Sequence, residues 1–384
     1  MINRPKYIKQ IEKALKRSPV VAILGPRQCG KTTLARQFSS GRKTFFFDLE
    51  SSVDDFRLQN PEMALGELTG LIVLDEIQRK PELFNVLRIL ADRPGKHAKF
   101  LILGSASPGI VRYASESLAG RVEFIEVSGF ELSETGVMDE KKLWMRGGFP
   151  RSFLSKSNEN SVKWRENFIQ TFLERDLPSL GLKIPAVAMR KFWTMLAHYH
   201  GQIWSASDLS RSLGLSDHTI KRYLDLLTGT FMIRQLQPWY ENISKRQVKS
   251  PKIYFRDSGI FHSFLSIYDK NALMSHPKVG ASWEGFAIEE TMRALKPADA
   301  YFWASHTGAE LDLMIISNGK KYGFEYKFSE TPKATRSMQI AIEDLNLSHL
   351  WIVYPGKQSV KIDKQITVLP LSDLSSIPIA GRTL

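Results

Sequence analysis

The stretch Gly25-Pro26-Arg27-Gln28-Cys29-Gly30-Lys31-Thr32-Thr33 decides the fold of the N-terminal part of the chain. It follows the apolar run Val20-Val21-Ala22-Ile23-Leu24 and precedes Leu34-Ala35-Arg36-Gln37-Phe38, whose apolar residues have helical spacing. A buried strand, a glycine-containing loop and a helix, with the spacing G-x-x-x-x-G-K-T, are typical of a loop that binds phosphate groups. The alternative is a glycine turn between a core strand and a helix, with a surface lysine there by chance.

The chemistry expected of this loop follows from its residue types. Glycines let backbone N–H groups converge on phosphate oxygens, and the helix N-terminus adds the positive end of its dipole. We expect residues 25–33 to bind ATP, with Lys31 reaching the β- and γ-phosphates and Thr32 offering its hydroxyl to Mg²⁺. Cys29 is the chain's single cysteine, and we interpret it as a small residue at a variable loop position rather than a reactive thiol.

Two later apolar runs also end in polar residues. Residues 71–74 are followed by Asp75 and Glu76, and residues 100–103 by Gly104 and Ser105. Parallel strands bring their carboxyl ends to one edge of a sheet, beside the phosphate loop. We therefore expect Asp75 to hold Mg²⁺, Glu76 to orient or deprotonate the attacking water, and Ser105 to contact the γ-phosphate or that water. A helix N-cap is the alternative role for Ser105.

An arginine, Arg121, comes just before the next expected strand, 122–127. With the motifs before it, this order of elements resembles the AAA+ ATPases, in which an arginine near this point often completes the site of a neighbouring subunit. The resemblance implies that Arg121 acts on a neighbour and that the chain forms a homo-oligomer. An intrachain salt bridge is the alternative.

The length of 384 residues predicts about two or three domains. No apolar run has the length of a membrane-spanning helix, and none after the basic N-terminus would serve as a signal sequence, so we expect a cytoplasmic protein without membrane contact. The formal net charge of +13 is unevenly spread: +2 in residues 1–140, +11 in 141–261 and 0 in 262–384. A concentrated basic surface is typical of phosphate-backbone binding, and a solvated basic face is the alternative.

The basic segment contains a helix-turn-helix pattern. Helices are expected over 189–200, 208–213 and 217–227, with a turn at Gly214-Leu215, and residues 231–236 are expected to begin the hairpin of a winged helix. The side chains expected to face DNA come from the third helix and from the segment after the hairpin: His218, Thr219, Lys221, Arg222, Lys245, Arg246, Lys249 and Lys252. A winged helix used only for protein contacts is the alternative.

The C-terminal third contains a strong hairpin signal, Asn318-Gly319. If these two residues form the turn, Asp312 lies opposite Glu325 and Glu310 lies opposite Lys327. Two carboxylates directly across a strand pair repel each other unless a cation joins them. A divalent metal, Mg²⁺ or Mn²⁺, with oxygen ligands is the expected cation.

This D…E-x-K arrangement resembles the PD-(D/E)XK nuclease superfamily. Glu284, on an expected helix, matches the acid that such folds supply from a preceding helix, and Gln339 matches a later position more weakly. The resemblance implies a metal-dependent nuclease site formed by Glu284, Asp312, Glu325 and Lys327. The alternative is an exposed face on which Lys327 simply pairs with Glu310 and Asp312.

Nearly the whole chain resembles a prokaryotic family that joins an AAA+ ATPase to a winged helix and a nuclease-like C-terminal domain of unassigned function. The motifs that carry the resemblance are the phosphate loop, Leu-Asp-Glu-Ile-Gln, Gly-Ser-Ala-Ser, Leu-Ala-Gly-Arg, Gly147-Gly148-Phe149-Pro150 and Pro251-Lys252-Ile253-Tyr254-Phe255-Arg256-Asp257-Ser258-Gly259. We expect an α/β fold in four parts: a parallel-sheet P-loop ATPase domain (1–130), a helical lid or linker (131–185), a winged helix (186–250) and a smaller nuclease-like domain (251–384).

The predicted function is Mg²⁺-dependent ATP hydrolysis coupled to DNA binding, with a metal-dependent nuclease as an added activity. The alternative is a nucleotide-gated switch or scaffold whose C-terminal domains bind protein partners and do not cleave DNA.

Overall fold

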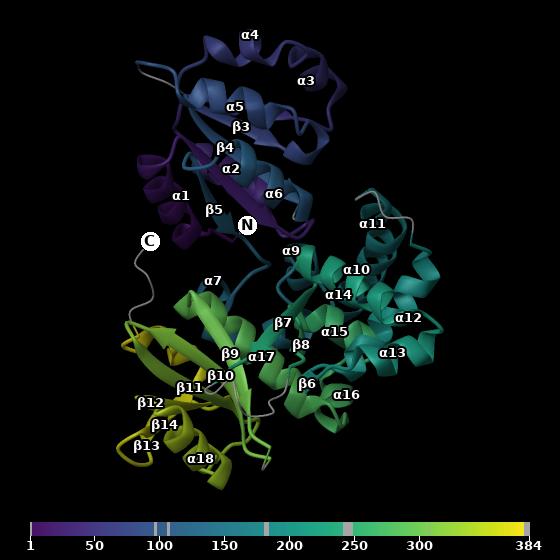
Figure 1. Ribbon diagram of the computed structural model, residues 1–384, viewed down its shortest axis with the longest axis vertical. Helices are drawn as coiled ribbons and strands as arrows, with labels where there is room; N and C mark the ends of the chain where they lie inside the picture. Colours follow the sequence, from purple (N-terminus) through teal and green to yellow (C-terminus); the bar gives the residue numbers. More distant parts are fainter. Residues whose placement is uncertain are drawn as a thin grey trace. The chain divides into compact units, whose positions relative to one another are not determined.

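The structure, a computed structural model, describes residues 2–95, 98–105, 108–179, 184–240, 249–306 and 308–379, without the side chains of 108–112. The chain forms two compact units (Figure 1). The first comprises residues 2–129 with Gly229–Phe231, and the second comprises residues 130–228 and those from 232 onward. Within the described ranges, no helix is long and apolar enough to cross a membrane.

The first unit is built on a parallel five-stranded sheet with the order β2-β3-β4-β1-β5. In chain order its elements are α1 (Pro5–Arg17), β1 (Val20–Gly25), α2 (Lys31–Ser39), β2 (Thr44–Asp48), α3 (Ser52–Arg57), α4 (Pro61–Gly66), β3 (Leu71–Asp75), the 3-10 helix η1 (Ile77–Arg79), α5 (Leu83–Ala91), β4 (Lys99–Ser105), α6 (Pro108–Ser117) and β5 (Val122–Glu126). Strand β4 lies between β1 and β3, as the expected position of Ser105 requires. The predicted α/β fold with a parallel sheet is confirmed.

Strands β1 and β3 are buried along their whole length. This burial explains their nearly continuous apolar sequence, since helices cover both faces of a parallel sheet. Alternate residues of β1, such as Val20 and Ala22, join a core with residues of α5 and α6. Helices α1 and α2 pack against β1 and cover its other face (Figure 1). The sheet therefore holds the carboxyl ends of its strands in fixed positions.

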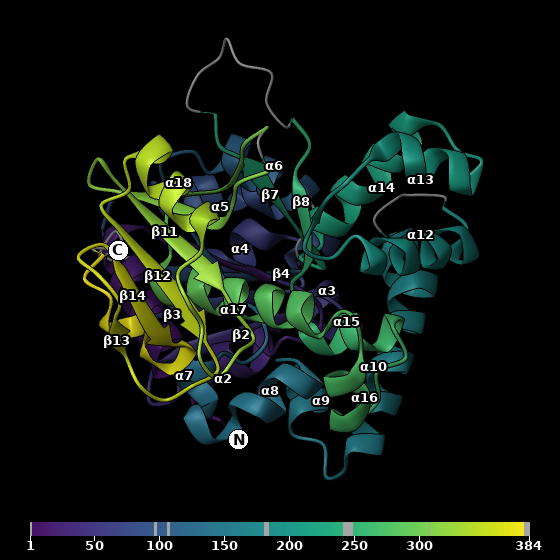
Figure 2. The same ribbon diagram turned by 90° about the horizontal axis from the view of Figure 1, so that it is seen from below.

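The second unit begins with helices and ends in a mixed sheet. Its helices are α7 (Leu132–Thr135), η2 (Val137–Asp139), α8 (Glu140–Arg146), α9 (Pro150–Phe153), α10 (Asn158–Thr171), the π-helical η3 (Phe172–Asp176), α11 (Leu177–Ser179), α12 (Ala186–His198), α13 (Ala206–Leu213), α14 (Asp217–Gly229), α15 (Ser258–Phe264), α16 (Lys270–Ser275), α17 (Val279–Leu295), α18 (Arg336–Leu345) and η4 (Leu371–Ser376). Helix α17 packs against β11, η4 and α15 (Figure 2). Helix α17 also carries Glu284 and Glu289, which belong to two separate charge clusters of this unit.

The strands of the second unit form one sheet with the order β13-β14-β12-β11-β10-β9-β7-β8-β6. They are β6 (Gln202–Ile203), β7 (Ile233–Pro238), β8 (Lys252–Phe255), β9 (Asp299–Ala304), β10 (Glu310–Ser317), β11 (Lys320–Tyr326), β12 (His349–Tyr354), β13 (Val360–Lys361) and β14 (Ile366–Pro370). Strand β7 pairs antiparallel with β8 through Ile233–Leu236, and its last two residues pair parallel with β9. Hydrogen bonding therefore runs across the expected boundary at residue 250, because β8 begins beyond it.

Candidate functional site

The phosphate loop connects β1, which ends at Gly25, to α2, which begins at Lys31. A Cβ atom on Gly25 would lie 1.9 Å from the carbonyl oxygen of Val127, so only glycine fits this position. Gly30 has a φ of 97°, in the left-handed region that glycine adopts without strain. Gln28 is also left-handed, with a φ of 61°. The loop is therefore a sharply turned segment packed against the end of β5.

The ammonium group of Lys31 is held by the loop itself. Its Nζ donates to the carbonyl oxygens of Gly25 (3.0 Å) and Pro26 (2.8 Å), and the residue is 6% exposed. Two backbone carbonyls thus orient the cation without neutralising it. The ammonium can therefore contact an anionic ligand that enters the loop.

The carboxyl end of β3 places two acids beside the loop. The Thr32 hydroxyl donates to Asp75 Oδ2 (2.7 Å), and the Glu76 N–H donates to Asp75 Oδ1 (3.0 Å). Burial raises the pKa of Asp75, and the Thr32 hydroxyl opposes that rise. Glu76 has a left-handed backbone with φ 56°, and its carboxylate accepts a hydrogen bond from the amide of Gln78. Gln78 was not predicted from the sequence, although it belongs to the Leu-Asp-Glu-Ile-Gln motif.

This donor set fits Mg²⁺. The cation prefers oxygen ligands and is commonly bound by a carboxylate together with phosphate oxygens and water. The Thr32 hydroxyl and the buried Asp75 carboxylate are oxygen donors already in contact with each other. A carboxylate whose charge is disfavoured by burial gains most from a nearby cation.

Ser105 and Arg121 were also predicted for this site. Ser105 pairs with Gly25 across β4 and β1, and its hydroxyl oxygen is buried without a hydrogen-bond partner in the described part of the chain. Arg121 forms two hydrogen bonds of 2.7 Å with the Asp92 carboxylate of the same chain. For Arg121, the structure thus shows the intrachain ion pair that the sequence left as the alternative.

The predicted DNA-facing residues are only partly where the sequence placed them. His218, Lys221 and Arg222 are exposed on α14, whereas Thr219 is half-buried and its hydroxyl bonds to that of Ser216. The opposite side of α14 is buried through Ile220, Tyr223, Leu224, Leu226 and Leu227. Lys245 and Arg246 lie outside the described residues.

Lys249 is exposed, but the expectation that Lys252 faces DNA is wrong. Lys252 is 3% exposed and points into a cluster of carboxylates. Lys252 lies at the start of β8, which pairs with β6 on one side and β7 on the other. The sequence pattern did not indicate this buried position.

The second unit brings Glu284, Asp312, Glu325 and Lys327 together, as the nuclease resemblance implied. The strand ladder runs from Leu313–Phe324 to Ser317–Lys320, which is the predicted register. The Asp312 N–H donates to Glu325 Oε2 (3.4 Å), and Lys327 Nζ donates to Glu325 Oε1 (2.9 Å). The alternative, in which Lys327 pairs with Glu310 and Asp312, is not observed in the described chain, because those two acids pair with Lys252.

Two residues of β8 complete this carboxylate cluster. Lys252 Nζ forms an ion pair with Glu310 and lies 3.7 Å from Asp312 Oδ1 and 3.9 Å from Glu284 Oε1. The Tyr254 hydroxyl donates to Glu284 Oε1 (2.6 Å). Burial and the charge of Asp312 raise the pKa of Glu284 to about 8. Sequence reasoning missed both β8 residues, although the motif that carries the family resemblance contains them.

The carboxylate cluster does not fit a divalent metal. In the described residues, no group of three or more His, Cys, Asp or Glu side chains has an arrangement that could hold a metal ion. The oxygens of Asp312 illustrate the reason: Oδ2 accepts from the Tyr326 N–H (3.0 Å), and Oδ1 faces the Lys252 ammonium. A cation already lies among the carboxylates that a metal would need.

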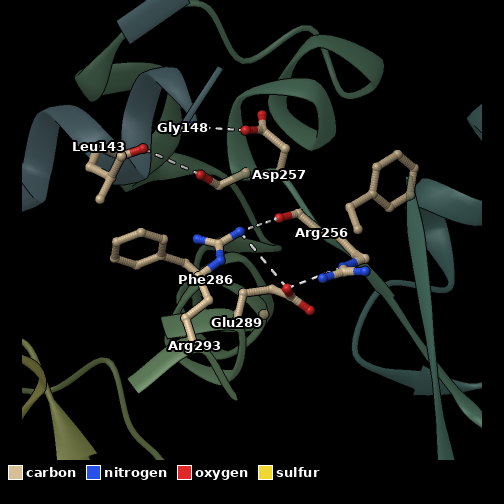
Figure 3. Close-up of a pocket in the computed structure, with 10 residues that line it drawn as sticks. Leu143, Gly148, Arg256, Asp257, Phe286, Glu289 and Arg293 are labelled. Carbon is tan, nitrogen blue, oxygen red and sulfur yellow. Dashed lines mark hydrogen bonds and ion pairs between the residues drawn. The ribbon is translucent and has the colours of Figure 1, made fainter. Parts of the chain in front are cut away.

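A second charge cluster lies further along α17, around Glu289. Figure 3 shows the pocket beside it, which residues of α8, β8, α15 and α17 line. Glu289 accepts from Arg234 Nη2 (3.1 Å) and Arg256 Nε (3.3 Å), and Arg293 Nη2 lies at 3.8 Å. Burial opposes ionisation of Glu289, but the charges of Arg234 and Arg256 outweigh burial and lower its pKa to about 2.

The same pocket explains two motifs that had no assigned role. The Asp257 carboxylate accepts from the Gly148 N–H (2.8 Å), as Figure 3 shows, and a Cβ on Gly147 would lie 2.1 Å from Asp257 Oδ1. A Cβ on Gly259 would lie 2.2 Å from the carbonyl oxygen of Arg146. The Gly147-Gly148 motif and the Arg256-Asp257-Ser258-Gly259 motif therefore pack directly on each other.

Comparison with known proteins finds two close mycobacterial relatives. They are the uncharacterized protein Rv2008c of Mycobacterium tuberculosis and the uncharacterized protein Mb2031c of Mycobacterium bovis. Each is 50% identical over 374 residues, which cover 97% of this chain and 85% of the relative.

Three family models match successive parts of the chain. Residues 17–136 match an AAA domain, residues 138–271 match a domain of unknown function (DUF8612), and residues 279–374 match another (DUF4143). Among solved structures, the Walker-type ATPase PABY2304 of Pyrococcus abyssi aligns with a TM-score of 0.49 and 15% identity, over 69% of this chain and 96% of that one. The match of residues 17–136 to an AAA domain, together with the parallel sheet and the loop between β1 and α2, gives the first unit the fold of an AAA-type P-loop ATPase.

Proposed function

The chain belongs to the same family as these two mycobacterial proteins, and we propose that it is a Mg²⁺-dependent ATPase whose turnover is coupled to DNA binding. The observation that carries the proposal is the contact between the Thr32 hydroxyl and the buried Asp75 carboxylate beside a lysine that pairs with no acid in the described chain. Their arrangement at the edge of a parallel sheet supports phosphate and metal binding by these groups.

Each residue of the first unit has a distinct proposed role. Lys31 binds the β- and γ-phosphates of ATP when its ammonium leaves the carbonyls of Gly25 and Pro26. Thr32 and Asp75 hold Mg²⁺, which neutralises negative charge on the phosphates when bound. Glu76 orients the attacking water and accepts its proton, and Gln78 positions the Glu76 carboxylate.

Ser105 supplies a hydrogen bond to the γ-phosphate or the attacking water. Its buried hydroxyl has no partner in the described structure and lies on the strand next to β1. A buried polar atom without a partner carries an energetic penalty that a ligand removes. Arg121 is proposed to act on a neighbouring subunit only if its pair with Asp92 opens, because the Asp92 carboxylate now accepts two of its guanidinium hydrogen bonds.

DNA binding is proposed for the helices and hairpin of residues 186–255. The elements follow the order α12, β6, α13, α14, β7, β8, with β8 between β6 and β7. This order and pairing support a winged helix, in which α14 is the recognition helix. The exposed cations of α14 support the same assignment, although Arg165, Arg234, Lys252 and Arg256 are turned inward and do not contribute to a basic surface.

The first test is the steady-state rate of ATP hydrolysis with Mg²⁺, with and without duplex and single-stranded DNA. We expect DNA to stimulate the wild-type rate at low salt, with stimulation that fades as salt rises, because phosphate contacts release counterions. The double variant Lys221→Glu/Arg222→Glu should lose the stimulation and keep the rate measured without DNA. Lys320→Glu, at an exposed lysine of β11, is the control for a general charge effect.

A wild-type rate that DNA leaves unchanged would contradict the DNA proposal and favour a nucleotide-gated switch that binds protein partners. The ATPase proposal has its own test, which is Glu76→Gln. This variant should still bind ATP, measured by calorimetry, and hydrolyse it about 10²–10⁴-fold more slowly. Undiminished hydrolysis would remove Glu76 from its proposed role.

A further inference from the structure

The carboxylate cluster of the second unit contains four acids and two lysines. The acids are Glu284 of α17, Glu310 and Asp312 of β10, and Glu325 of β11; the lysines are Lys252 and Lys327. The two lysines differ in their surroundings. Lys327 contacts Glu325 and its side chain is 39% exposed, whereas Lys252 contacts three of the acids and its side chain is 3% exposed.

We propose that the Lys252 ammonium is the resident cation of the carboxylate cluster and that it excludes divalent metals from it. The ammonium lies among oxygens of Glu284, Glu310 and Asp312, which come from a helix and a strand that are far apart in sequence. Those oxygens are the hard donors that Mg²⁺ or Mn²⁺ would need.

The backbone fixes Lys252 in this position. Within β8, Lys252 pairs with Ile203 of β6 on one side and with Leu236 of β7 on the other. Its ammonium also lies 5.5 Å from the centre of the Phe302 ring, which covers it further. Backbone pairing on both sides of β8 fixes the face of the sheet toward which the Lys252 side chain points.

Other groups also contact the carboxylates of this cluster. The Tyr254 hydroxyl holds Glu284, the Tyr326 N–H holds Asp312, and Lys327 with the Asp312 N–H holds Glu325. A divalent ion in the centre of the cluster would lie close to the Lys252 ammonium, and two cations about 4 Å apart in a protein interior repel strongly. The D…E-x-K pattern is therefore present without an open metal position, and cleavage that depends on Mg²⁺ or Mn²⁺ is not expected while Lys252 is in place.

The test is a titration of the nucleotide-free full chain with Mn²⁺, followed by electron paramagnetic resonance of the free ion. All samples carry Asp75→Asn, which removes the metal ligand of the first unit. We expect no specific Mn²⁺ binding with Lys252 present. Lys252→Met should gain one bound Mn²⁺ with an affinity increase of at least about tenfold, and adding Asp312→Asn should remove that gain. Lys320→Met, which removes an exposed lysine from β11, should gain nothing.

Two results would overturn the proposal. One is Mn²⁺ bound to the chain that retains Lys252 and lost on Asp312→Asn, because the lysine would then not exclude the metal. The other is a folded Lys252→Met chain that binds no Mn²⁺. If Lys252→Met does not fold, two chains that retain Lys252 can still be compared, one with Asp312 and one with Asp312→Asn. Their Mn²⁺ binding decides whether the cluster accepts a metal. Loss of ATP hydrolysis has no bearing on this test, so the proposal fails or stands separately from the ATPase function.

Discussion

The phosphate loop and the carboxylate cluster each contain a buried lysine next to acidic residues, yet they differ in what the lysine bonds to. Lys31 donates to two backbone carbonyls of its own loop, and the nearby Asp75 carboxylate is bonded to a hydroxyl and an N–H. Lys252 instead contacts three carboxylates directly. The first arrangement leaves a cation and an anion each available for a ligand, whereas in the second they satisfy each other. Motif content alone does not distinguish them.

The largest effect is expected from removing the cation of the carboxylate cluster. Lys252→Met should lower the free energy of unfolding of the second unit by about 3–5 kcal/mol, because buried carboxylates lose their counter-ion. The loss should be smaller at about pH 5 than at about pH 8, since protonation neutralises the acids. Urea unfolding at both pH values measures it. A variant as stable as wild type at the higher pH would show that Lys252 is not an essential partner of the acids.

Removing the lysine of the phosphate loop should instead reduce ATP turnover strongly and stability only slightly. Lys31→Met should reduce ATP turnover by about 10²–10³-fold, as the loss of one preorganised charge donor at a transition state does. Its effect on unfolding should be smaller than that of Lys252→Met, because only carbonyl groups lose a partner. Turnover assays and urea unfolding, run on both variants, test the contrast. Comparable destabilisation by the two substitutions would show that the two lysines do not differ in their contribution to folding stability.

A smaller effect is expected in the pH dependence of the stability of the second unit. The folded-state pKa of Glu284 is raised from 4.5 to about 8, first by burial and then by Asp312. Between those two values the folded state keeps a proton that the unfolded chain has lost, so stability should fall as pH rises through this window. The slope from this residue is at most about 1.4 kcal/mol per pH unit. Glu284→Gln should flatten this dependence and be more stable relative to wild type at about pH 8 than at about pH 5. An unchanged slope in the variant would show that Glu284 does not titrate in this range.

The fold of the first unit was predictable because its signals are local. Apolar runs ending in Gly25, Asp75 and Gly104-Ser105, with a loop of fixed spacing, determine a parallel sheet and the edge at which its polar residues meet. The hairpin register around Asn318-Gly319 was predictable for the same reason, since turn residues fix the strand pairing.

The environment of Lys252 was not predictable, because it depends on contacts across long stretches of chain. Its sequence neighbours, which include Lys249, suggested an exposed basic wing. Burial of this lysine results from pairing of β8 with β6 and β7 and from carboxylates on α17 and β10. The ion pair of Arg121 with Asp92 and the hydrogen bond from Gly148 to Asp257 likewise join residues that no short pattern connects.

Strand β7 pairs with β8 through Ile233–Leu236 and with β9 through its last two residues. This pairing has a practical consequence for dividing the chain into fragments. One family model ends at residue 271, within α16, and the next begins at residue 279, where α17 starts, which suggests a natural place to divide the gene. A fragment starting at residue 279 would expose the free edge of β9 and remove Lys252 from its acids, and open strand edges of this kind promote aggregation. A fragment that starts at residue 130, where the second unit begins, keeps every strand of this sheet.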